Sequence, residues 1–128
     1  MTVLAAASQA APAPVLSPSP PTICKPGAYN DWLPATAQVE QLEQALSTYF
    51  EKIPLADRQL PARGQVYDRQ YRGLMRDGRK MIYGSFYPVG RFRDDECLIV
   101  SADGGNQLWY LWFDAQDGQI VQFHIGGR

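Results

Sequence analysis

The chain has 128 residues, of which 45% are hydrophobic and 12% aromatic, and its formal net charge is −1. That length fits one domain with a tail, because domains commonly hold about 100–150 residues. The composition is globular and predicts no transmembrane segment, since no apolar run approaches the roughly 20 residues that cross a bilayer. We expect a leader over residues 1–22 and a single domain over residues 23–128.

The leader has two parts. Residues 2–10 resemble the second half of a secretory signal, with small residues where a signal peptidase cleaves, but no positive segment precedes them. They are either a signal whose start is missing or an Ala/Pro-rich tail. Residues 11–22 contain five prolines, which exclude a helix and a central strand, so we expect a flexible or polyproline-like leader.

The two cysteines, Cys24 and Cys97, give a prediction about the compartment. In an exported chain they are the only internal pair, and their disulfide would tie the N-terminal arm to the sheet. Closing a loop of about 73 residues would stabilise the fold by roughly 4 kcal/mol. We therefore expect a protein of the periplasm or a secreted one; the alternative is two reduced thiols in a cytosolic protein. Ile23 is not the small residue that precedes a lipoprotein cysteine, so no lipid anchor is predicted.

One amphipathic helix is predicted from Thr36, the expected N-cap, to Pro54, which ends it. Its apolar stripe is expected to cover a sheet. Before the helix, an irregular arm from Cys24 to Leu33 carries the aromatic residues Tyr29 and Trp32. The stripe follows helical spacing at Val39, Leu42, Leu46, Tyr49, Phe50 and Ile53.

A first hairpin is predicted from strands at Gln65–Met75 and Arg79–Val89 around Asp77-Gly78, a pair typical of type I′ turns. A two-residue turn would pair Arg76 with Arg79. One face, the better core, would carry Tyr67, Arg69, Tyr71, Met75, Ile82 and Phe86, and the other Asp68, Gln70, Arg72, Tyr83, Ser85 and Tyr87.

The last third of the chain is predicted to be an antiparallel meander of strands at Cys97–Val100, Leu108–Phe113 and Ile120–Ile125. If Asp117-Gly118 forms a two-residue turn, Trp112 pairs with Phe123. One face then carries Leu108, Tyr110, Trp112, Val121, Phe123 and Ile125, and the other Trp109, Leu111, Phe113, Ile120, Gln122 and His124.

Both faces of this last hairpin are apolar, whereas one helix covers only one face of a sheet. Either the N-terminal arm, with Tyr29, Trp32 and Leu33, lies over the second face, or that face is an exposed patch for a partner. In the second interpretation Leu111 belongs to the patch. The partner-binding residues are then expected to be Arg72, Tyr83, Tyr87, Trp109 and Phe113.

Basic residues concentrate between Arg58 and Arg93, a window that holds nine of the twelve bases and only two acids. They are either solvated positions on an electrically dipolar domain or a basic surface for an acidic partner. The alternation of arginine and tyrosine over residues 67–72 could stack on a nucleic acid, but export argues against that partner.

Catalytic and metal-binding motifs are weak. The one histidine, His124, is either a packing residue or half of an acid–base pair with Asp103 or Asp114. Two cysteines and one histidine on separate elements do not make a zinc site, and no cofactor is predicted. Residues 94–96 are either a solvated acidic run or a weak cation site. Asp103-Gly104-Gly105 is a glycine turn without the lysine of a phosphate loop.

The order of a helix, a crossing loop and four antiparallel strands resembles that of cystatin-like folds. The stretch from Asp103-Gly104-Gly105 through an aromatic strand to Asp117-Gly118 also resembles small exported proteins of Gram-negative bacteria with no established function. The resemblance covers Gly64 to Arg128 and implies a fold but no activity. Cystatin inhibitors carry a Gln-x-Val-x-Gly hairpin, and residues 65–68 depart from it, so protease inhibition is not implied.

The sequence therefore predicts an α+β protein with one amphipathic helix packed on a four-stranded antiparallel sheet. We expect a non-enzymatic protein-binding role in the cell envelope, as an inhibitor, an immunity protein or an accessory subunit. The partner would be another envelope protein or a second copy of the chain. The alternatives are a small α+β enzyme or ligand binder with a pocket near His124, and a purely structural subunit of an envelope complex.

Overall fold

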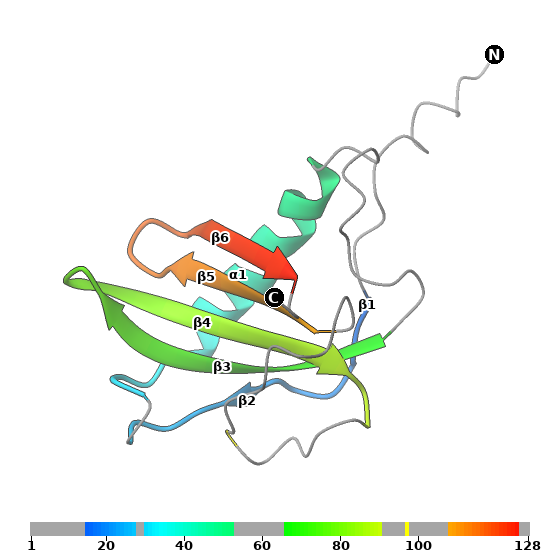
Figure 1. The fold of residues 1–128 in the computed structure, drawn as a ribbon, viewed down its shortest axis with the longest axis horizontal. Coiled ribbons are helices and arrows are strands. Elements are labelled where there is room, and N and C mark those ends of the chain that lie inside the picture. Colours follow the sequence, from blue (N-terminus) through cyan, green and yellow to red (C-terminus); the bar gives the residue numbers. More distant parts are fainter. Residues whose placement is uncertain (1–14, 28–29, 53–65, 91–96, 98–107, 126–128) are drawn as a thin grey trace.

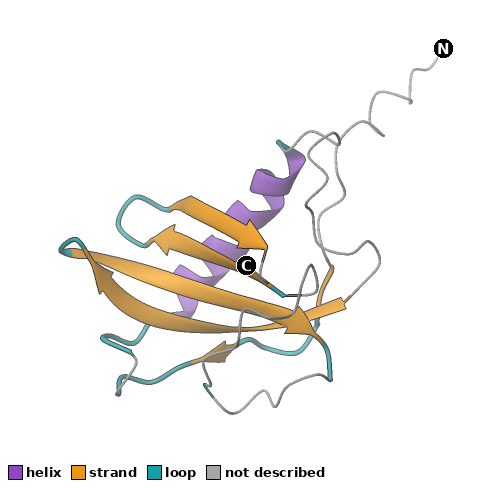
Figure 2. Ribbon diagram, in the orientation of Figure 1, coloured by secondary structure: helices purple, strands orange, loops and turns teal. Residues whose placement is uncertain are grey.

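The computed structural model describes residues 15–27, 30–52, 66–90, 97 and 108–125. These residues form one helix and a single curled sheet, in which the spatial order is β1-β3-β4-β5-β6 and β2 also pairs with β3 (Figure 1). The helix crosses one face of the sheet (Figure 2). The elements are β1 (Val15–Leu16), β2 (Thr22–Ile23), α1 (Thr36–Glu51), β3 (Val66–Arg76), β4 (Arg79–Pro88), β5 (Trp109–Asp114) and β6 (Gln119–Ile125).

The predicted four-stranded antiparallel sheet is wrong. The sheet has six strands and is mixed, because β1 and β2 both run parallel to β3, with Val15 beside Val66 and Ile23 beside Tyr71. Prolines between and around the two short strands limit their length, and proline is tolerated at a sheet edge, where half of the main-chain groups face away from the ladder. Residues 15, 16 and 22 of the predicted leader thus lie in short edge strands.

The N-terminal arm continues along the same edge of β3. The main-chain N–H of Asp31 donates to the carbonyl of Gly73 at 2.7 Å, and Trp32 forms an isolated bridge with Gly73. The indole N–H of Trp32 also donates to the carbonyl of Leu74 at 3.2 Å. The β3 edge is thus covered by main chain from three segments. Residues 1–14 of the predicted leader lie outside the described residues, so its limits stay a prediction.

The register predicted for the first hairpin is confirmed. Arg76 pairs with Arg79, and the pairing continues without a shift to Tyr67 and Pro88. Asp77 and Gly78 take the positive φ angles, 54° and 77°, that a type I′ turn requires. The face predicted to be the better core is confirmed at Tyr67, Tyr71, Ile82 and Phe86, which belong to the core cluster. It is wrong at Met75, which is 48% exposed.

The register predicted for the second hairpin is wrong. Trp112 pairs with Gln122, and Leu111 pairs with Phe123, because the connection holds the four residues 115–118. The carboxylate of Asp114 accepts hydrogen bonds from the main-chain N–H groups of residues 116 and 117, at 2.9 and 3.0 Å, and so closes a longer turn. A register shift follows at Trp112 and Phe113. Phe123 therefore lies on the same face as Leu111, whereas it was predicted to lie on the opposite face with Trp112.

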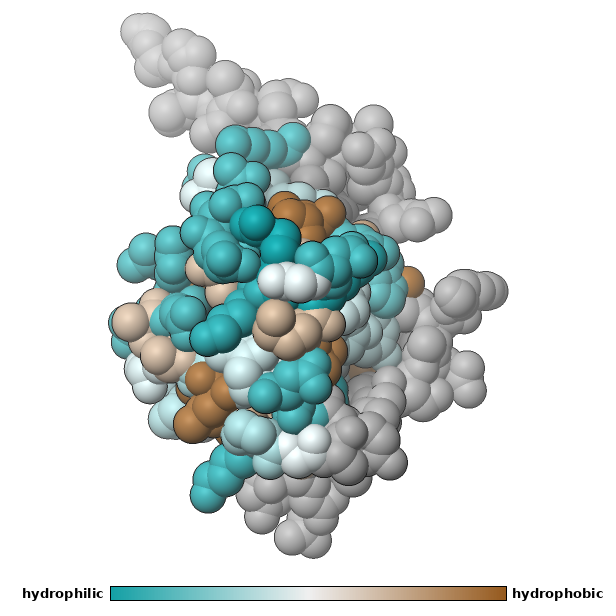
Figure 3. Space-filling view, turned by 90° about the vertical axis from the view of Figure 1, so that its left-hand side faces the viewer, coloured by the Kyte–Doolittle hydropathy of each residue, from teal (hydrophilic) through white to brown (hydrophobic). Residues whose placement is uncertain are grey.

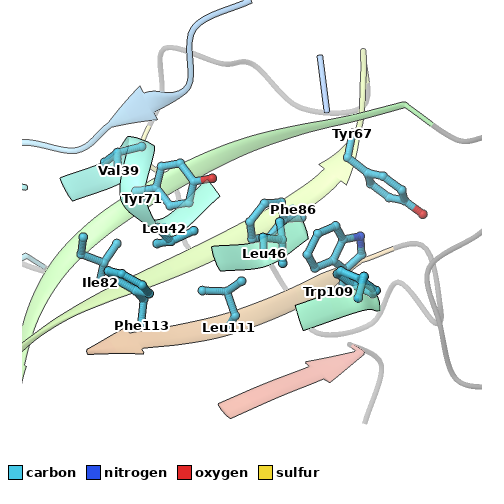
Figure 4. Close-up of a cluster of buried hydrophobic side chains, with 11 residues drawn as sticks. Val39, Leu42, Leu46, Tyr67, Tyr71, Ile82, Phe86, Trp109, Leu111 and Phe113 are labelled. Carbon is cyan, nitrogen blue, oxygen red and sulfur yellow. The ribbon is translucent and has the colours of Figure 1, made fainter. Parts of the chain in front are cut away.

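Helix α1 begins at Thr36, one residue after its N-cap, which is Ala35 rather than the predicted Thr36. The Gln38 side chain accepts the main-chain N–H of Ala35 at 2.8 Å, as in the reciprocal half of a capping box. The buried side of the helix packs on β3, β4 and β5 (Figure 4). The core cluster is Val39, Leu42, Leu46, Phe50, Tyr67, Tyr71, Ile82, Phe86, Trp109, Leu111 and Phe113.

Trp109 is the centre of this core. Its ring stacks on Phe86 with centroids 3.9 Å apart and an interplanar angle of 2°, and Phe50 and Tyr67 meet it edge-on. The residue is fully buried, and its indole N–H has no hydrogen-bond partner among the described residues. A buried donor that stays unpaired typically costs about 1–3 kcal/mol.

The predicted disulfide is confirmed: Cys24 and Cys97 are bonded and their Cα atoms are 5.7 Å apart. Of the predicted strand Cys97–Val100, residues 98–100 lie outside the described ranges. In the part of the chain that the structure describes, no helix is long and apolar enough to cross a membrane.

Candidate functional site

The sheet face that lies opposite α1, here called the outer face, is built from two rows of side chains that run across four strands. Neighbouring strands place these residues directly beside one another, and alternation along each strand points them away from the helix. The first row is Arg72, Tyr83, Trp112 and Gln122, and the second is Gln70, Ser85, Tyr110 and His124.

Part of this face is accessible to solvent. We call Arg76, Tyr83, Trp112, Gln122 and His124 the outer patch, because each of these side chains is partly or well exposed. The Arg76 guanidinium lies 4.5 Å above the Trp112 ring and donates to the Gln122 side chain at 3.2 Å. The ring centroids of Trp112 and Tyr83 are 4.8 Å apart. The outer patch is therefore a connected set of aromatic and polar side chains.

Stacking extends the outer patch toward the sheet edge. Tyr110 is buried, and its ring stacks on Tyr83 at 5.9 Å and on His124 at 5.0 Å. Partial burial lowers the pKa of His124 below its ordinary value, so the imidazole is neutral at pH 7. Arg76 is thus the cationic member of the outer patch.

The end of the outer face near Arg72 and Tyr87 is not accessible to solvent. Arg72 is 3% exposed, and its guanidinium donates to the carbonyl of Cys97 at 3.2 Å. Burial lowers the pKa of Arg72 below its ordinary value. The disulfide therefore anchors residue 97 over this end of the face, and Tyr87, which is 1% exposed, is buried there as well.

The five residues predicted to bind a partner do not share one face. Arg72, Tyr83 and Tyr87 lie on the outer face, but Trp109 and Phe113 are fully buried in the core beneath α1. The assumed common face is wrong because β5 pairs with β4 so that Trp109 stands beside Phe86 and Phe113 beside Ile82, on the core face, whereas Tyr83 stands beside Trp112. A binding role for these five residues stays a prediction, and of them only Tyr83 belongs to the accessible outer patch.

Sequence reasoning missed Trp112 and Arg76. Trp112 takes the place on the outer face that had been given to its neighbours in β5, and Arg76 was treated only as a turn residue. A signal for the correct register was present: Asp114 precedes Ala-Gln-Asp-Gly, and an aspartate at the start of such a segment commonly accepts from the main-chain N–H groups that follow it.

Neither interpretation of the apolar last hairpin holds as stated. Trp32 lies against Gly73 on β3 and Leu33 is 54% exposed, so these arm residues do not cover β5 and β6. Tyr29 lies outside the described residues. The face with Trp109 and Leu111 is not an exposed patch, because α1 covers it.

The predicted pairing of His124 with Asp114 is not formed. The two residues stand four positions apart along the β5–β6 ladder, a separation of about 13 Å. The Asp114 carboxylate is instead held by Arg79 at 2.8 Å and by its own turn, and the hydrogen bond from Arg79 lowers its pKa to about 2. Asp103 lies outside the described residues, so the enzymatic alternative stays a prediction.

Two arginines of the basic window are ion-paired. Besides Arg79 with Asp114, Arg69 donates to both carboxylate oxygens of Glu43 on α1, at 2.8 and 3.4 Å. Arg69 also donates to the carbonyls of Ser17 and Ser19 at 2.9 and 3.0 Å. These two arginines therefore hold the fold together, and four other bases of the window, Arg58, Arg63, Arg91 and Arg93, lie outside the described residues. Within the described ranges, no group of three or more histidine, cysteine or acidic residues could hold a metal ion.

Comparison with known proteins reveals no relative: no family model, no curated protein and no solved structure matches this chain. The resemblance to small exported proteins with a cystatin-like core therefore stays a prediction.

Proposed function

We propose that this chain is an exported cell-envelope protein that binds another protein, without catalysis, through the outer patch. The observation that carries the proposal is the composition of that patch. Binding hot spots are enriched in tryptophan, tyrosine and arginine, and here Trp112 contacts both Tyr83 and Arg76 on an accessible sheet face.

The outer patch is also preorganised. Trp112 is fixed between the Arg76 guanidinium and the Tyr83 ring, and all three residues stand on strands in the middle of the sheet. Side chains that are already ordered lose little rotamer entropy when a partner docks. An ordered, amphipathic surface of this kind suits a folded protein partner.

The disulfide supports the proposed location in the periplasm or outside the cell. Disulfides persist in oxidising compartments and are rare in the cytosol. The bond between Cys24 and Cys97 closes most of the domain, so its oxidation state matters for the whole fold. An envelope protein is accordingly the proposed partner, and a nucleic acid is not expected.

Capture from an envelope extract tests the proposal. The oxidised chain is compared with Trp112→Ala and with Leu33→Ala, a control that truncates a 54% exposed apolar residue in the arm. We expect one partner that wild type and the control retain equally and that Trp112→Ala binds at least about tenfold more weakly, as for a hot-spot residue.

Equal binding by Trp112→Ala and wild type would rule out the outer patch as the contact surface. Folding of each variant is checked first by near-ultraviolet circular dichroism, so that a lost contact is not confused with a lost fold.

A further inference from the structure

The two edges of the sheet differ in how far described main chain covers them. The β3 edge is covered by β1, β2 and the bridge at Trp32, whereas no described strand pairs with the outer edge of β6. Residues 119–125 contain no charged residue and no proline, the common protections of an edge strand. Among the described residues, β6 has one feature that can protect an edge strand, which is the register shift opposite Val121. The Val121 side chain is 50% exposed.

An open hollow of about 470 Å³ lies beside the start of β6. One wall is the second half of α1, and in Figure 1 the last turns of this helix extend past β6 at the top of the view. A strand added to β6 would therefore lie on these turns, and its helix-facing side chains would enter the hollow. The lining residues are Ala45, Thr48, Tyr49, Lys52, Gly118, Gln119 and Ile120.

We propose that β6 accepts an extended segment of a partner protein as an additional strand, and that Lys52 selects an acidic side chain in that segment. Strand addition obtains affinity from main-chain hydrogen bonds and specificity from pockets that receive alternate side chains. Among the described residues that line the hollow, Lys52 alone is charged, and β6 itself is uncharged. An acidic residue in the added strand would meet an opposite charge there, and a basic residue a like charge.

A second copy of the chain fits this place less well. If β6 paired with β6 of another molecule around a two-fold axis, both helices would lie on the same side of the continuous sheet. The last turns of each α1 would then need the space beside the other β6. A segment that brings only a strand avoids this conflict.

The hollow and the outer patch lie on opposite sides of the sheet, so the two proposals fail separately. The end of the molecule that carries both hairpin turns is mostly hydrophilic, with apolar residues in small separate groups (Figure 3). Of the described surface in this view, no part offers a continuous apolar area that would compete for the segment.

The test uses the intact oxidised chain and blocked synthetic peptides of alternating valine and threonine. One peptide has a central glutamate, a second has lysine there, and a third has prolines in place of two threonines. Binding is followed by amide chemical shifts up to about 1 mM peptide, the weak end of useful affinity. We expect the glutamate peptide to shift the amides of residues 119–125, the lysine peptide to bind about two- to fivefold more weakly, and the proline peptide not to bind.

Charge reversal supplies the matched pair of variants. Lys52→Glu is expected to reverse the preference between the glutamate and lysine peptides, whereas Lys25→Glu, at an exposed lysine of the arm, leaves it unchanged. The proposal is overturned if no peptide binds, if both charged peptides bind wild type equally, or if the shifts map to β3. It is also overturned if light scattering detects a dimer that Val121→Lys dissociates, since a second copy then occupies the edge.

Discussion

Gly73 shows how closely the N-terminal arm approaches the sheet. A Cβ built at this position would lie 2.2 Å from the carbonyl oxygen of Trp32 and 2.8 Å from its ring. The arm and β3 are joined here by two main-chain hydrogen bonds to the Gly73 carbonyl. Neither backbone can move away without breaking these bonds, so the position requires glycine.

Gly73→Ala is therefore expected to lower the free energy of unfolding by about 1–3 kcal/mol, the usual cost of overpacking. Gly27→Ala is the control, because a Cβ there would meet nothing within 4 Å. Urea denaturation at neutral pH measures both. A Gly73→Ala protein as stable as the control would mean that Trp32 does not lie against β3.

Asp114 determines the length of the second hairpin turn and makes it sensitive to acid. Its pKa is lowered from 3.8 to about 2, first by the hydrogen bond from Arg79 and then by the main-chain N–H groups of its turn. A carboxyl group whose pKa is depressed by folding stabilises the fold above its unfolded pKa. This stabilisation is lost as the pH falls from about 4 to about 2.

Asp114→Asn should accordingly be less stable than wild type at pH 6, and the difference should shrink as the pH falls through this range. Denaturant titrations between pH 6 and pH 2 follow the difference. Asp117→Asn is the control, since its side chain is 62% exposed and solvent screens its contact with Arg79. A difference that stays constant with pH would contradict the assigned role of the Asp114 charge.

At the scale of elements, Arg69 joins three segments of the chain. It donates to Glu43 on α1 and to the carbonyls of Ser17 and Ser19 beside β1, and the Tyr71 hydroxyl donates to the same carboxylate at 2.6 Å. Burial, with the nearby Glu43 charge, raises the pKa of Tyr71 well above its ordinary value, so the hydroxyl stays protonated. The network fixes the arm and the helix to the same strand.

Removing Arg69 leaves Glu43 without its cation and two carbonyls without their donor. We expect Arg69→Ala to cost roughly 2–4 kcal/mol, somewhat below the usual value for a broken buried pair because Glu43 is 23% exposed. Hydrogen exchange at Ser17 and Cys24, whose N–H groups bond to β3, should accelerate. Arg79→Ala, which removes a half-exposed arginine from the other end of the sheet, should leave that exchange unchanged.

The two hairpins explain which elements the sequence could predict. Asp77-Gly78 is flanked by residues with no competing acceptor, so the two-residue turn and both faces of β3 and β4 were predictable. Asp117-Gly118 gives the same local signal, but the carboxylate of Asp114 binds two N–H groups and extends the turn. A register change of one residue exchanges the faces of β6 relative to β5. Phe123 and Ile125 were therefore grouped with Trp112 instead of Trp109, and the wrong face of β5 was taken as the core.

At the scale of the whole molecule, the N-terminal arm was the least predictable part. Its prolines correctly exclude a helix, but main-chain pairing at an edge needs only two residues at a time, as in β1 and β2. The disulfide was predictable because Cys24 and Cys97 are the only cysteines. In the chain-entropy description, closing that loop stabilises the fold by about 4 kcal/mol.

The proposed function depends on the assignment of Trp112 to the outer patch and of Trp109 to the core. Acrylamide quenching of two variants that each keep one of these tryptophans tests it most directly: Trp32→Phe with Trp112→Phe, and Trp32→Phe with Trp109→Phe. The structure predicts that Trp109 alone gives blue-shifted, poorly quenched emission, and that Trp112 alone is readily quenched. Equal quenching of the two, or stronger quenching of Trp109, would contradict the assignment of the faces and remove the basis for the proposed binding surface.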